Sequence, residues 1–142
     1  MKSGAAILAL TLMLATSAFG AGPPMSLDDS ANFLIDRASA AQLWKETVPA
    51  RVARLYPPRK FRFVSEVTGG FTDSKTCVVT ARAMLLPVVF LPVQGTKVVY
   101  APIKSATAFD SAANLSREQC QGLARAKLKD AIQSIASALA AS

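Results

Sequence analysis

Two stretches of the chain carry apolar residues at helical spacing. The first starts with Ala31, Leu34 and Ile35 and predicts a helix over residues 31–47. Pro49 ends this helix or opens a second short turn through Leu55. Three polar residues precede the pattern and are candidate N-caps, because their side chains can accept hydrogen bonds from the first turn: Asp28, Asp29 and Ser30.

The second helical pattern lies at the end of the chain and is the clearest in the sequence. Ser116 and Gln119 form a capping box, and Leu115 is placed to pack against Cys120 as a hydrophobic staple. We therefore expect a helix over residues 117–140. Its apolar face consists of Cys120, Leu123, Ala124, Leu128, Ala131, Ile132, Ile135 and Leu139. This face needs a sheet or another helix to cover it.

Between these helices the apolar residues alternate, which is typical of strands. After Pro57-Pro58, a first strand places Phe61, Phe63, Ser65 and Val67 on one face. Gly69-Gly70 then predicts a bulge or loop, and residues 72–75 (TDSK) predict a hairpin turn. The return strand covers residues 76–86 and has Cys77, Val79, Ala81 and Ala83 on one face.

A second hairpin is expected over residues 88–93 and 96–101, around Gln94-Gly95. The most apolar part of this region, residues 83–93, is too short to span a bilayer, and we interpret it as a buried strand. Residues 102–114 show no clear period and are interpreted as a connector. The prediction is one α+β domain over residues 28–142. It has an N-terminal helix, a small antiparallel sheet of about four strands in two hairpins, and a long C-terminal helix packed on the sheet.

The first twenty residues have the pattern of a signal peptide. Lys2 precedes an apolar run over residues 5–15, and Ala18-Phe19-Gly20 places small residues where signal peptidase requires them. We expect cleavage after Gly20, a disordered leader over residues 21–27, and a periplasmic or secreted protein without a membrane span. The alternative is an N-terminal membrane anchor, for which the run is short.

The sequence contains two cysteines, Cys77 and Cys120. An oxidising compartment allows them to pair in only one intramolecular way, so we predict a Cys77–Cys120 disulfide. A redox pair is the first alternative, but the spacing is not C-x-x-C. A metal site is the second, and it would need further ligands.

The charge and composition of the chain limit which partners and which catalytic or metal sites it can have. Without Lys2, the chain has 15 Lys and Arg against 9 Asp and Glu, a net charge near +6 that favours anionic partners. The chain has no histidine, which removes Ser-His-Asp and Cys-His catalysis and histidine-ligated metals. The acids are scattered, and Asp28-Asp29 is interpreted as a helix cap rather than a metal site. No catalytic residue, cofactor or metal is predicted.

The candidate contact surface is the basic segment, residues 51–62 (RVARLYPPRKFR). It contains five cations and no acid: Arg51, Arg54, Arg59, Lys60 and Arg62. Arginine is suited to phosphate and carboxylate groups, because its guanidinium donates two parallel hydrogen bonds. The alternative is that residues 59–62 form the solvated side of an edge strand, where cations discourage aggregation.

Three function classes follow. The leading hypothesis is an exported, non-enzymatic binding protein, such as an inhibitor, an immunity-type protein or an accessory factor. Its partner would be a protein or an anionic component of the cell envelope, and nucleic acid is not expected. The alternatives are a structural subunit of an envelope or secretion assembly, and an enzyme that works without histidine.

Overall fold

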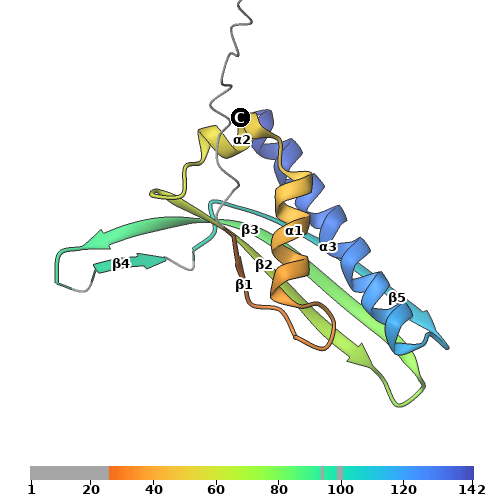
Figure 1. Cartoon of the computed structure of the whole chain (residues 1–142). Coiled ribbons are helices and arrows are strands. Elements are labelled where there is room, and N and C mark those ends of the chain that lie inside the picture. Colours follow the sequence, from red (N-terminus) through yellow and green to blue (C-terminus); the bar gives the residue numbers. More distant parts are fainter. Residues whose placement is uncertain (1–25, 94, 99–100) are drawn as a thin grey trace, which may run out of the picture.

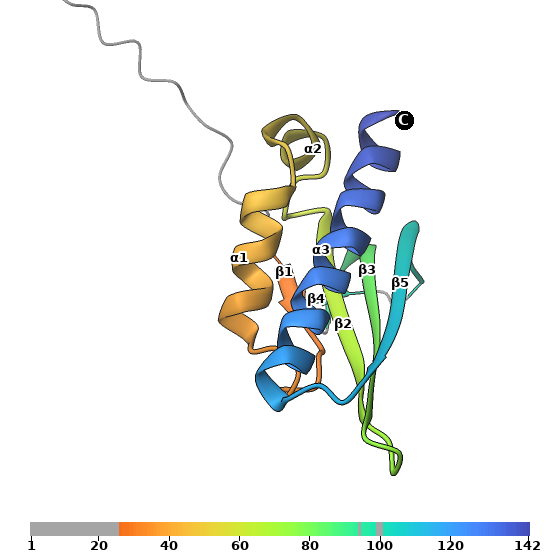
Figure 2. The ribbon, with the colours of Figure 1, turned by 90° about the vertical axis from the view of Figure 1, so that its right-hand side faces the viewer.

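The computed structural model describes residues 26–93, 95–98 and 101–142 of the chain. They form a sheet with helices on one of its faces, as Figures 1 and 2 show. The elements in chain order are β1 (Ser26–Asp28), α1 (Arg37–Thr47), α2 (Ala50–Leu55), β2 (Phe61–Phe71), β3 (Thr76–Leu91), β4 (Gly95–Val98), β5 (Lys104–Ala113) and α3 (Arg117–Ala140). The predicted α+β class, with a long C-terminal helix packed on a mostly antiparallel sheet, is confirmed.

The sheet is built around β3, which is long enough to pair with three strands. Its first part lies between β2 and β5, and both pairings are antiparallel. Beyond Pro87 the same strand continues to Leu91 and pairs with β4. Strand β1 extends the sheet by pairing with β2 in parallel, which local sequence patterns did not predict.

The core lies between the sheet and helices α1 and α3. Alternate residues of β2 and β3 face the helices and are fully or almost fully buried, including Phe63, Val67, Val79 and Leu85. The Trp44 ring of α1 packs on Phe63 with the ring centroids 5.1 Å apart. The predicted apolar face of α3 packs on the sheet, and all of its residues are buried except Leu123, which is partly buried.

The Cys77–Cys120 disulfide is present and joins β3 to the first turn of α3. The two Cα atoms are 5.8 Å apart, and both cysteines are completely buried. The bond connects residues separated by 43 positions, so it fixes the last helix on the second strand of the hairpin.

The start of α1 corrects the predicted helix, which was too long by six residues. The N-cap is Asp36, whose carboxylate accepts a hydrogen bond from the Ser39 amide at 2.8 Å. Asp28 and Ser30 are not caps. The Ser30 hydroxyl donates to Asp28 and accepts from the Val67 amide, so these side chains hold the segment after β1 against β2. Leu34 and Ile35 fill the core from a turn rather than from a helix.

Residues 102–114, interpreted as a connector, contain β5. The exposure of this strand alternates, and Ala106 and Ala108 face α3. These small inward side chains allow α3 to lie close to β5. Alanine differs little in hydropathy from the outward residues, so the sequence shows no clear alternation here. The expected interruption at Gly69-Gly70 is also wrong. The register runs through both glycines to Phe71 paired with Cys77, without an extra residue.

The predicted burial of residues 83–93 holds only for the first part of that stretch. Leu85 and Leu86 are buried, but Val89 is 40 % exposed and Val93 is 96 % exposed. The second predicted hairpin does form, between β3 and β4. Figure 1 shows it extending away from the helices, which explains why Val89, Leu91 and Val93 are not covered.

The N-terminal predictions fall mostly outside the described residues. This holds for the signal peptide over residues 1–20 and for the leader as far as residue 25. The leader was predicted to reach residue 27, but Ser26 and Leu27 belong to β1. The predicted leader is therefore two residues too long at its carboxyl end.

The capping box at the start of α3 gives a first testable prediction. The Ser116 hydroxyl accepts a hydrogen bond from the Gln119 amide, and the Gln119 side chain accepts one from the Ser116 amide. Ser116→Ala should lower the free energy of unfolding by about 1 kcal/mol, because it leaves a helical amide without its partner. Urea denaturation followed by circular dichroism would measure this. Exposed Ser134 in the same helix is the control, and Ser134→Ala should not destabilise the protein.

Candidate functional site

The basic segment folds into three consecutive parts. Arg51 and Arg54 lie on α2, a short helix that is fixed by buried Val52 and Ala53. Arg59 and Lys60 lie in the turn after Pro57-Pro58 and are exposed. Arg62 lies on β2, is partly buried, and donates a hydrogen bond to the Phe61 carbonyl at 3.0 Å. The segment is therefore not one continuous edge strand, since only Arg62 belongs to a strand.

None of the five cations has an acidic partner within 4.0 Å in the described part of the chain. The ion pairs found there lie elsewhere. Arg82 pairs with Glu66, and Lys127 pairs with Asp110 and Asp130. The cations of the basic segment therefore keep their full charge available to an external anion.

Backbone pairing brings the end of the basic segment to the place where β3 leaves the main sheet. The Val88 amide donates to the Lys60 carbonyl at 2.7 Å, and Arg62 lies opposite Leu86. On the other side of β3, Lys104 lies opposite Leu85. Lys104 was not singled out from the sequence, because it is 42 positions away from Arg62 and only the β3–β5 pairing brings it here.

The sequence around this place contains no acid. Residues 47–65 and 74–109 include neither Asp nor Glu, and they contain nine of the cations of the chain. Of these cations, Lys60, Arg62 and Lys104 lie at the root of the β3–β4 hairpin, and neither stretch contributes a carboxylate there. Such a distribution attracts phosphate and carboxylate groups and speeds their encounter with the protein.

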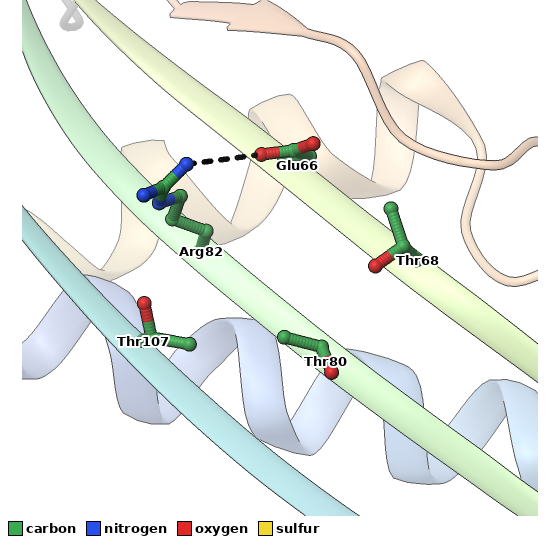
Figure 3. A pocket seen from close by; sticks show the side chains of 5 residues that line it. All are labelled: Glu66, Thr68, Thr80, Arg82 and Thr107. Atoms are coloured by element: carbon green, nitrogen blue, oxygen red, sulfur yellow. Dashed lines mark ion pairs between the residues drawn. The ribbon is translucent and has the colours of Figure 1, made fainter.

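The sheet face opposite the helices has a pocket, which is a second candidate site. Figure 3 shows a shallow pocket lined by side chains of three adjacent strands: Glu66, Thr68, Thr80, Arg82 and Thr107. Its volume is about 290 Å³, and the Arg82 and Glu66 side chains approach to 3.7 Å across it. These groups can bind a small polar molecule by hydrogen bonds. They are also what a solvated sheet face presents, because cross-strand ion pairs and threonines stabilise sheets.

The perturbed pKa values belong to the helices and not to these surfaces. Hydrogen bonds from Ser39 hold the pKa of Asp36 below its usual value. Hydrogen bonds from its own backbone amide and from Ser116 lower the pKa of Glu118. The hydrogen bond to Asp130 raises the pKa of Lys127. All three groups stabilise helix ends or the packing of α3, which is a structural role.

The described residues contain neither a cluster of metal ligands nor a membrane-spanning helix. No group of three or more Cys, Asp or Glu residues is placed there to hold a metal ion. No helix in residues 26–93, 95–98 and 101–142 is long and apolar enough to cross a membrane.

Comparisons with known proteins give little. No protein-family model matches the chain, and no curated protein matches it in sequence. One solved structure is similar over 82 % of this chain and 90 % of its own, with 14 % identity and a TM-score of 0.39. It is described as a "putative lipoprotein" from Caulobacter crescentus CB15. At this level of similarity it carries no argument about the present chain.

Proposed function

We propose that this chain is an exported, non-enzymatic binding protein that contacts an anionic partner of the cell envelope through the basic segment. The observation that carries the proposal is that five cations lie within twelve residues that contain no acid, and that none of them has an acidic partner among the described residues: Arg51, Arg54, Arg59, Lys60 and Arg62. Unpaired arginines on a short, anchored helix and turn are suited to phosphate and carboxylate groups.

Two further features support this proposal. The buried disulfide fits maturation in an oxidising compartment, as the signal-peptide pattern predicts. The chain has no histidine and its acids are scattered along the sequence, so catalytic sites built on histidine are excluded. A binding role needs only the charge and the shape of the surface.

The proposal is tested with a triple variant, Arg51→Ala, Arg54→Ala and Arg59→Ala. The purified protein is titrated against acidic glycan and against anionic phospholipid vesicles at low and at physiological salt. We expect the variant to bind its anionic ligand at least about tenfold more weakly than the unmodified protein. Binding by the unmodified protein should weaken as salt rises, because exposed charges are screened.

The matched control removes the same charge from another surface. Lys45, Arg125 and Lys129 are exposed on α1 and α3, and replacing all three by alanine should leave binding almost unchanged. Equal losses in both triple variants would mean that only the total charge matters. Unchanged binding in the first variant would remove the basic segment from the site.

A further inference from the structure

Half of the exposed large apolar side chains in the described residues lie in one place. Among the described residues, eight large apolar side chains are exposed, and four of them lie on the β3–β4 hairpin or at its root. These four are Val89, Leu91, Val93 and Ile103. We call residues 88–93 and 95–98 the arm. Its tip residue Val93 is 96 % exposed, more than any other large apolar side chain in the described part of the chain.

The arm has little support from the rest of the molecule. Strand β4 makes extensive contacts only with β3, and Figure 1 shows the arm pointing away from the helices. A two-stranded hairpin alone is marginally stable in water. Exposed apolar groups at the end of such a hairpin are a reason to expect that the arm is covered when the protein works.

The charges at the root of the arm indicate what covers it. Lys60 and Arg62 lie on one side of β3 and Lys104 lies on the other, at the level where the arm begins. A second copy of the chain would bring two such cationic roots together, and their repulsion opposes this arrangement. An anionic lipid surface instead offers an apolar interior for the tip and phosphates for the cations.

The dimensions agree with this partner. The strand advances by three residues from Val88 to Leu91, which is about 10 Å at the rise of a strand. Interfacial elements bury their apolar face roughly 5–10 Å into the boundary between headgroups and acyl chains. With the tip at that depth, the lysines and arginines at the root lie at the level of the headgroups.

We propose that the arm is a membrane-contact element, which inserts its apolar tip into an anionic lipid surface while the root cations bind the headgroup phosphates. This inference rests on the proposed function and names the partner of the same cationic surface. If the arm inserts, burial of Val93 among the acyl chains adds to the affinity that the cations provide.

The experiment uses the processed, disulfide-bonded protein and vesicles of phosphatidylcholine with roughly one-third phosphatidylglycerol. Val93→Ser keeps the charge and changes a side chain that makes few contacts in the protein. We expect its affinity for these vesicles to fall roughly tenfold, because serine lacks the two methyl groups that valine transfers from water into the lipid. Phe109→Ser, which removes an exposed apolar side chain from the open face of the sheet, should bind like the unmodified protein.

Insertion is measured directly with a tryptophan at the tip. The emission of Val93→Trp should shift to the blue on vesicle binding and be quenched by lipids brominated in their acyl chains. The native Trp44 is fully buried and contributes a constant background. The matched control is Phe71→Trp, which should show neither effect, because Phe71 ends β2 and pairs with Cys77 at the end of β3 far from the arm.

Each contrary outcome has a distinct meaning. Salt-sensitive vesicle binding that Val93→Ser leaves unchanged overturns the insertion of the arm but keeps the proposed function. Binding to acidic glycan without binding to vesicles has the same consequence. A discrete oligomer that dissociates on Val93→Ser shows that a second copy covers the arm. If no anionic ligand binds, both the arm proposal and the proposed function fail.

Discussion

Loss of the Cys77–Cys120 bond is expected to lower the free energy of unfolding by roughly 4 kcal/mol. The bond closes a long loop, since 43 positions separate its ends, and it therefore restricts the unfolded chain strongly. In the folded state it joins two fully buried positions on β3 and α3. A domain of this size has a total stability of only about 5–15 kcal/mol, so the loss removes a large share of it.

Urea denaturation of the oxidised and the reduced protein measures this effect without changing the sequence. The Cys77→Ala/Cys120→Ala variant should behave like the reduced protein, apart from a small loss of buried volume. The variant itself, treated with reductant, is the control and should not respond. Equal midpoints for the oxidised and reduced forms would show that the bond contributes nothing to stability.

The elements that the sequence predicts well are those whose signals are local. Helix α3 has the predicted bounds, because a capping box fixes its start and an apolar face repeats over its whole length. The β2–β3 turn is also as predicted, and Lys75 in that turn has a positive φ of 57°. The basic segment could be found in the same way, because its cations are close together in the chain.

The elements that the sequence predicts poorly depend on partners far away in the chain. Leu34 and Ile35 have helical spacing, but the Ala31 amide donates to the Val67 carbonyl, which keeps this segment against β2. Strand β5 is a strand because it pairs with β3, although its inward residues are mostly alanine. The arm was predicted to be buried because hydropathy does not show where a long strand leaves its sheet.

The candidate site shows the same limit. The sequence indicates cations over residues 51–62, but it does not show that Lys104 joins them or that an exposed apolar arm starts beside them. Both facts follow from the position of β3 between β2 and β5. The charge pattern suggests an anionic partner, and the strand pairing shows which residues from other parts of the chain lie beside these cations.

Gly69→Ala is expected to destabilise the protein by about 3 kcal/mol. Gly69 has a φ of +129°, a backbone conformation that residues with a side chain rarely adopt. A Cβ atom there would lie 2.0 Å from the Val78 carbonyl oxygen. The clash involves the backbone of the paired strand, so relief requires a shift of β2 relative to β3. The neighbouring Gly70 has a φ of +146°, but a Cβ atom there would meet only the Phe33 ring at 3.4 Å. Gly70→Ala should therefore cost less than Gly69→Ala.

The same chain offers a control of opposite sign. Gly122 lies on the exposed side of α3, and a Cβ atom there would meet nothing within 4 Å. Gly122→Ala should stabilise the protein by up to about 1 kcal/mol, because alanine favours the helix more than glycine does. Thermal and urea denaturation of the three alanine variants would establish the order. If Gly69→Ala were as stable as the unmodified protein, the close approach of β2 and β3 at this pair would be wrong, and with it the register that leads to the disulfide.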